Sequence, residues 1–132
     1  MLDNWIADVV GRMHVAGITG QQLAKECGYN SAYLSMVLHG NKGNEQTRER
    51  ICAALNFLID GPDEWISEIE EMRNKREPAV SVEEITAQLN RSSKKEQYDV
   101  CQVEDFIRGQ NSNFVIREKV KEAIKDLIAN EK

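Results

Sequence analysis

Apolar residues recur along the chain at the three- and four-residue spacing of an α-helix, and polar stretches separate these segments. The apolar positions of the first segment, residues 2–15, are Trp5, Ile6, Val9, Val10 and Met13. Those of a later segment, residues 46–59, are Ile51, Ala54, Leu55, Leu58 and Ile59. The pattern predicts an all-α fold in which both segments are amphipathic helices.

Between these segments, residues 18–42 (ITGQQLAKECGYNSAYLSMVLHGNK) predict two short helices joined by a tight turn. Thr19 and Gln22 have the spacing of a capping box, which begins a helix. Gly28 supplies the positive φ that commonly follows a helix end. A second helix begins near Ser31 and buries Leu34, Val37 and Leu38. Two short helices with a glycine between them are typical of a helix-turn-helix that reads DNA.

A stop signal at residues 60–63, Asp-Gly-Pro-Asp, divides the chain into two halves. After it, Trp65 corresponds to Trp5 at an offset of 60. We therefore expect a DNA-binding domain over residues 1–60 and a second helical module over residues 61–132.

The second half repeats the pattern of the first. Residues 81–86 match residues 19–24 at an offset of 62, with the capping box retained, and residues 103–128 match residues 34–59 at an offset of 69. The seven additional residues lie around positions 91–95. We interpret the second half as a degenerate copy that serves dimerisation or partner binding. An amphipathic helical extension unrelated to the first half is the alternative, and it stays open here.

The charge balance is acidic, which counts against nucleic-acid binding by the chain as a whole. The net charge is −5, and the acidity lies mostly in the second half: residues 1–60 hold five Lys/Arg and six Asp/Glu, whereas residues 61–132 hold twelve and sixteen. Lys42, Arg48 and Arg50 follow the second short helix closely. A local basic edge is therefore compatible with the overall charge.

Several classes of protein find no support in the sequence. The three cysteines, Cys27, Cys52 and Cys101, lack the spacing of a zinc site, and we expect reduced thiols and no metal or cofactor. No phosphate loop, H-E-x-x-H or G-x-S-x-G motif is present, so we expect no enzyme. No apolar run approaches the ~20 residues of a membrane helix, and no signal peptide is evident. We therefore expect a cytoplasmic protein that makes no membrane contact.

Residues 18–59 resemble the lambda-repressor/Cro-like (Xre) helix-turn-helix family. The matching motif positions are Thr19, Leu23, Ala24, Gly28, Leu34, Ser35 and Gly40. The resemblance implies a lambda-repressor-like helix-turn-helix bundle, followed here by the degenerate second module. It also implies a transcriptional regulator of phage or mobile-element type that binds double-stranded DNA as a homodimer.

The same resemblance implies the contact residues. Base readout would come from Asn30, Ser31, Ala32, Tyr33 and Met36. Phosphate contacts would come from Gln21, Ser35, Asn41 and Lys42. Because the reading helix has no Arg or Lys, the common bidentate contact to guanine is missing, and we expect an A·T-leaning site. Modest affinity per subunit would require a dimer on half-sites ~34 Å apart.

Other functions remain open at this point. The second copy carries Asp99, Glu104 and Asp105 where a reading helix would meet phosphates, and carboxylates are repelled there. The main alternative is a phage protein that uses the same fold to bind and inhibit a protein partner through its acidic half, as repressor antagonists and anti-CRISPR-like inhibitors do. A purely structural assembly module is a third possibility. For Tyr33, packing on a neighbouring helix is the alternative to DNA contact.

Overall fold

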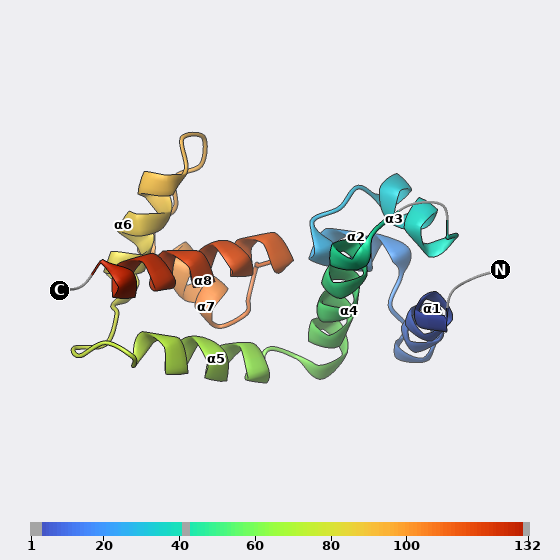
Figure 1. Cartoon of the computed structure of the whole chain (residues 1–132), viewed down its shortest axis with the longest axis horizontal. Coiled ribbons are helices and arrows are strands. Elements are labelled where there is room, and N and C mark those ends of the chain that lie inside the picture. Colours follow the sequence, from blue (N-terminus) through green and yellow to red (C-terminus); the bar gives the residue numbers. More distant parts are fainter. Residues whose placement is uncertain (1–3, 41–42, 131–132) are drawn as a thin grey trace. The chain divides into compact units, whose positions relative to one another are not determined.

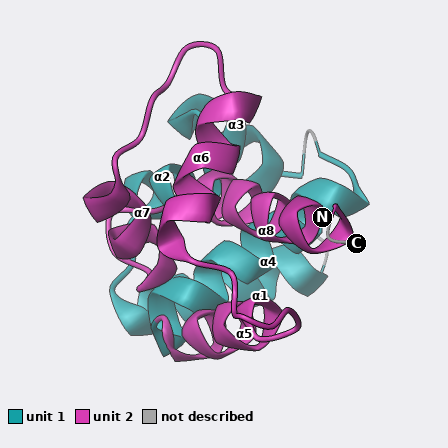
Figure 2. Ribbon diagram, turned by 90° about the vertical axis from the view of Figure 1, so that its left-hand side faces the viewer, with its two compact units in different colours: residues 1–61 teal, residues 62–132 magenta. Residues whose placement is uncertain are grey.

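The computed structural model describes residues 4–40 and 43–130. Over these ranges the regular structure consists of eight α-helices and no strand, which confirms the all-α prediction (Figure 1). The chain divides into two compact units, residues 1–61 (unit 1) and 62–132 (unit 2) (Figure 2). No helix in the described part of the chain is both long enough and apolar enough to cross a membrane.

Unit 1 contains α1 (Asn4–Ala16), α2 (Gly20–Cys27), α3 (Ser31–Leu38) and α4 (Glu45–Asp60). Helix α2 packs against both α3 and α4, and α1 packs against α4. The buried side chains that join them are Val9, Met13, Leu23, Ala24, Cys27, Leu34, Val37, Ile51, Ala54 and Leu55. Each of the four helices therefore contributes one apolar face to a common core.

Unit 2 contains α5 (Asp63–Arg73), α6 (Val82–Ser92), α7 (Val100–Ile107) and α8 (Phe114–Ala129). Helix α8 packs against the other three. Trp65 of α5 is buried, and its indole N–H donates to the Phe106 carbonyl of α7 at 2.9 Å. This bond satisfies the polar atom of a large core side chain and ties α5 to the end of α7.

Helix starts in the two units are built alike. Thr19 begins α2 and Ser81 begins α6, each with a complete capping box. Asn44 begins α4 and Asn113 begins α8, and each side-chain oxygen accepts from the backbone N–H three residues ahead at 2.9 Å. The two asparagines are 69 residues apart. The capping positions thus follow the offsets of the sequence pattern.

Burial follows the offset of 69 as well. The pairs buried in both units are Leu34 and Val103, Val37 and Phe106, Ile51 and Val120, Ala54 and Ala123, and Leu55 and Ile124. Gly40 and Gly109, also 69 residues apart, have φ of 80° and 78° just after α3 and α7. The two units therefore present the same order of helices, with corresponding buried faces and helix ends.

The units differ in the connection between their second and third helices. In unit 1 this connection is residues 28–30, and in unit 2 it is residues 93–99. Helix α6 is also three residues longer than α2. The seven additional residues are thus divided between an extra turn of α6 and a longer loop.

Some apolar positions predicted to face the core are exposed instead. Val10 is 43 % exposed, Leu58 36 % and Ile59 38 %. Their helical spacing was read correctly, since each lies in a helix. Periodicity marks the apolar face of a helix, but it does not show how far along that face other helices cover it.

Candidate nucleic-acid interface

The start of α2 is held by local bonds. The Thr19 hydroxyl oxygen accepts from the Gln22 backbone N–H at 3.1 Å, and the Gln22 side-chain oxygen accepts from the Thr19 N–H at 2.8 Å. Gln21 lies between them and is exposed. No acidic residue occupies the first turn of α2, so no carboxylate of that turn neutralises the partial positive charge of the helix N-terminus.

The turn from α2 to α3 has a well-defined backbone. Gly28 has φ of 76°, and the Tyr29 N–H donates to the Ala24 carbonyl at 2.9 Å, which closes the end of α2. The Asn30 side-chain oxygen then caps α3 by accepting from the Ala32 N–H at 2.7 Å. Asn30 is therefore a capping residue first, and its amide oxygen is already bonded.

Helix α3 presents an uncharged surface to solvent. Leu34 and Val37 are buried, whereas Ser31, Ala32, Ser35 and Met36 are exposed. None of the eight residues of α3 carries a charge, and its first turn has no carboxylate. Four of the predicted contact residues thus lie together on the outer side of one helix.

Tyr33 occupies a different environment. It is half-buried, and its hydroxyl lies 3.3 Å from the Thr47 hydroxyl of α4. Its ring meets the Tyr29 ring edge-on at a centroid distance of 5.0 Å. The structure thus contains the packing contact named above as the alternative for Tyr33, and base contact by this side chain stays a prediction.

The two described cations of the predicted basic edge, Arg48 and Arg50, lie at different places. The Arg50 guanidinium lies 4.9 Å from the centre of the Tyr29 ring, beside the α2–α3 turn. The Arg48 guanidinium lies 5.9 Å from the centre of the Trp5 ring of α1. Asn41 and Lys42, both predicted to contact phosphate, lie outside the described residues. Among the described cations of the predicted basic edge, only Arg50 is placed at the turn.

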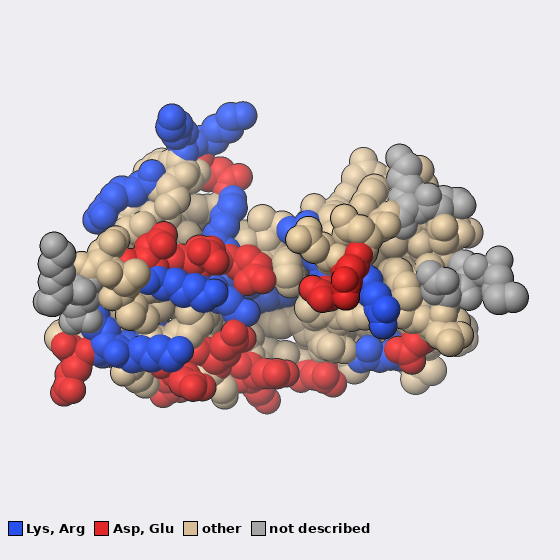
Figure 3. Space-filling model, in the orientation of Figure 1, with Lys and Arg blue, Asp and Glu red and all other residues tan. Residues whose placement is uncertain are grey.

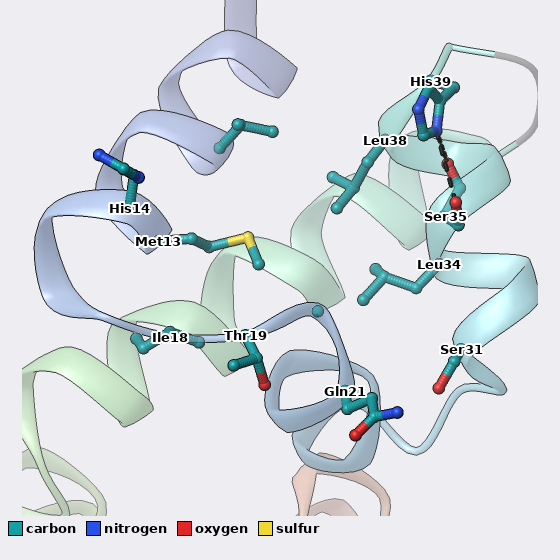
Figure 4. Close-up of a pocket in the computed structure, with 12 residues that line it drawn as sticks. Met13, His14, Ile18, Thr19, Gln21, Ser31, Leu34, Ser35, Leu38 and His39 are labelled. Carbon is teal, nitrogen blue, oxygen red and sulfur yellow. Dashed lines mark hydrogen bonds between the residues drawn. The ribbon is translucent and has the colours of Figure 1, made fainter.

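An open groove of about 700 Å³ lies between α1, the start of α2 and α3. Its apolar lining is Val10, Met13, Ile18, Leu34 and Leu38. Gln21 and Ser31 lie at the same end of the groove, and Ser35 lies farther along it (Figure 4). The His39 ring closes the other end, where its Nδ1 is 2.6 Å from the Ser35 carbonyl oxygen. Sequence reasoning missed this groove because it placed Val10 and Leu38 on apolar helix faces that pack in the core, whereas Val10 is 43 % exposed and Leu38 is half-buried.

The carboxylates expected to form an acidic surface on α7 are arranged differently. Asp99 precedes α7 and caps it by accepting from the Gln102 N–H at 2.8 Å. Glu104 and Asp105 are half-buried, and Glu104 pairs with Arg108 at 3.8 Å. Acidic side chains gather instead over α5 (Figure 3). Its exposed carboxylates are Asp63, Glu64, Glu68, Glu70 and Glu71.

The described residues show no set of three or more His, Cys, Asp or Glu side chains that could hold a metal ion. Cys27 is buried, and this burial raises the pKa of its thiol to about 12. Such a thiol stays protonated at neutral pH and is a poor nucleophile.

Comparison with known proteins finds no match for this chain among family models, curated proteins or solved structures.

Proposed function

We propose that unit 1 is a lambda-repressor-like helix-turn-helix domain that binds duplex DNA, and that the protein is a transcriptional regulator of phage or mobile-element type. The observation that carries this proposal is that the exposed outer side of α3 is uncharged, and that the first turns of α2 and α3 contain no carboxylate. Phosphates are favoured at helix N-termini whose first turns lack carboxylates.

The side chains of α3 suit close approach to base edges. Ser31 and Ser35 each offer a hydroxyl that donates and accepts, while Ala32 and Met36 offer apolar groups for thymine methyls. The Asn30 amide oxygen is bonded to the backbone, so a bidentate contact with adenine would break the cap of α3. Asn30 therefore reads a base with its amide nitrogen alone, which weakens discrimination at that position.

Affinity per subunit is modest on this account. Helix α3 has no Arg or Lys, so strong charge-assisted contacts must come from neighbouring segments. We propose that a homodimer on half-sites ~34 Å apart supplies the remaining affinity. Sedimentation of the protein alone and with a two-half-site duplex measures the stoichiometry, and one subunit per duplex would rule out this mode of binding.

The proposal is tested by selecting duplexes from a randomised library with the purified protein and titrating salt. Ala32→Glu places a carboxylate on the exposed first turn of α3, where the helix dipole favours it, so the fold is retained. Cys101→Glu makes the same addition at the corresponding exposed position of α7, 69 residues later. We expect an enriched A·T-leaning sequence that Ala32→Glu abolishes and Cys101→Glu preserves. Absence of any enriched sequence contradicts sequence-specific regulation.

A second function has one observation in its favour. The exposed carboxylates of α5 form an acidic surface that suits a basic protein partner (Figure 3). A protein that inhibits such a partner would lose binding when Glu64 and Glu71 are changed to Gln, and it would be insensitive to Ala32→Glu. The two functions are therefore distinguished by the same set of variants.

A further inference from the structure

The loop between α6 and α7 departs most from its counterpart in unit 1. It begins after an α6 that is one turn longer, and it stands away from the helices of unit 2 (Figure 1). Residues 91–97, Arg-Ser-Ser-Lys-Lys-Glu-Gln, contain no apolar side chain. Arg91, Lys94 and Lys95 are all exposed. We call residues 91–95, which are the last two residues of α6 and the first three of the connection, the basic loop.

Hydrogen bonds hold the base of this loop closed. The Asn90 amide nitrogen donates to the Tyr98 carbonyl at 2.9 Å, and the Tyr98 N–H donates to the Asn90 side-chain oxygen at 2.7 Å. The Gln97 amide nitrogen donates to the Ser93 carbonyl at 3.2 Å. The Tyr98 ring also packs edge-on against Phe106 at 5.5 Å. The base of the loop is thus preformed, and its backbone loses little conformational entropy when a ligand binds.

Glu96, the acidic residue next to the basic loop, is hydrogen-bonded to a side chain at the base of the loop. The Tyr98 hydroxyl donates to the Glu96 carboxylate. Burial of the phenol, reinforced by this carboxylate, raises the pKa of Tyr98 to about 12, so it remains a donor at neutral pH. Glu96 is therefore held at the base of the loop, while the cationic side chains extend from it.

We propose that the basic loop contacts the phosphate backbone of duplex DNA, an inference that rests on the function proposed above. Lysine, arginine and serine side chains are common phosphate contacts, and this loop offers all three. Protein interfaces instead are anchored by buried aromatic or apolar side chains, which residues 91–97 lack. The seven residues by which unit 2 exceeds the pattern of unit 1 thus add a phosphate contact that α7 does not supply.

The contact is electrostatic and reads no bases. Each neutralised phosphate adds about 0.9 to the slope of log K against log salt. Lys94 and Lys95 together account for about 1.8 of that slope. Their removal weakens binding to all sequences by a similar factor and leaves the enriched sequence unchanged.

The test uses the full chain carrying Lys94→Ala together with Lys95→Ala, which leaves the Asn90–Tyr98 bonds intact. The matched control is Lys119→Ala with Lys125→Ala, which removes the same charge from exposed positions of α8. Binding to a selected duplex and to a mixed-sequence duplex is measured over a range of salt. We expect the slope to fall by about 1.8 in the loop variant and to keep its original value in the control.

The outcomes separate this inference from the proposed function. A sequence-specific complex whose salt slope is unchanged in the loop variant overturns the inference alone. Salt-dependent binding without sequence preference that the loop variant weakens supports the inference and overturns the proposed function. No binding to either duplex overturns both the inference and the proposed function. An equal decrease of the salt slope in the loop variant and in the α8 control overturns the inference.

Discussion

The connection between the second and third helices is a tight turn in unit 1 and a longer loop in unit 2, although the helices on either side correspond. In unit 1, Gly28 ends α2 and Asn30 begins α3 two residues later. In unit 2, the position that corresponds to Gly28 at an offset of 62 is Asn90, where α6 continues. The cores and caps on either side correspond, so they do not dictate the connection. The residues of the turn itself decide whether two helices meet closely or a loop extends.

The third helices of the two units, α3 and α7, differ in the charge of their outer sides. Helix α3 presents an exposed side without charge, whereas α7 begins after a capping Asp99 and carries half-buried Glu104 and Asp105. The buried side chains of both helices occupy corresponding positions. A helix can therefore keep its packing while its outer side gains or loses the ability to approach phosphate.

The largest effect on stability is expected when buried side chains are truncated at corresponding positions of the two cores. Leu55 and Ile124 are both fully buried, and truncation to Ala should lower the free energy of unfolding by about 2–5 kcal/mol in each case. Each unit has its own tryptophan, Trp5 or Trp65, so fluorescence during denaturation reports on one unit when the other tryptophan is replaced by Phe. Val15→Ala at an 89 % exposed position is the control, with an expected change within about 0.5 kcal/mol. A loss below 1 kcal/mol for either core variant would show that the position is not packed as described.

The second-largest effect on stability is expected at the Gly28 turn, which only unit 1 has. Gly28→Ala places a side chain at φ of 76°, which costs about 1–2 kcal/mol. Gly11→Ala in the exposed middle of α1, where a Cβ meets nothing within 4 Å, should stabilise by about 0.5–1 kcal/mol. Thermal unfolding of the two variants measures both signs. Equal effects of the two substitutions would contradict a left-handed turn at Gly28.

The helix caps should give smaller and similar effects in the two units. Asn44→Ala and Asn113→Ala each remove one capping acceptor and should each cost about 1 kcal/mol. Asn44 also accepts from the Thr47 hydroxyl at 3.2 Å, so its loss should be the larger of the two. Chemical denaturation of both variants provides the comparison. If Asn113→Ala left the free energy of unfolding unchanged, the correspondence between α4 and α8 would be contradicted.

The smallest effect is a pH dependence that distinguishes the capping box of α6 from that of α2. Unit 1 uses neutral Gln22, whereas unit 2 uses Glu84, whose pKa is lowered from 4.5 to about 2 by the bound Arg76 guanidinium and the Ser81 N–H. Because the folded-state pKa lies below the unfolded one, the stabilisation is complete above about pH 4.5 and is lost as pH falls toward 2. The Glu84 side chain is 38 % exposed, so solvent limits the effect to within about 1 kcal/mol.

Comparing wild type with Glu84→Gln isolates this carboxylate from the others. The difference in unfolding free energy between the two proteins should be constant near neutral pH, shrink below about pH 4.5 and be lost as the pH falls through about 2. A difference at pH 2 as large as the one at neutral pH would assign the stabilisation to the shape of the side chain and not to its charge.

Much of the fold could be predicted because it depends on local signals. Thr19 with Gln22 and Ser81 with Glu84 mark helix starts by side-chain chemistry that acts over three residues. Helical spacing identified the buried side of α4, although not that Leu58 and Ile59 stay exposed. That exposure depends on where neighbouring helices end, which is a tertiary property.

The candidate site was less predictable for the same reason. The exposed side of α3 follows from its 3.6-residue period, and the family resemblance implied the contact residues Ser31, Ala32, Ser35 and Met36. The second role of Asn30 as a cap and the contact between Tyr33 and Thr47 required the backbone geometry. The groove between α1 and α3 is formed by side chains distant in sequence, so no local pattern announces it.

The most direct test of the central claim is to map backbone amide chemical shifts of the full chain while the selected duplex is added. If the outer side of α3 is the DNA-binding surface, the largest shift changes fall on residues 20–22 and 30–36, and the amides of α7 change little. Shift changes concentrated on α5 or α7, with those of α3 unmoved, would contradict the account.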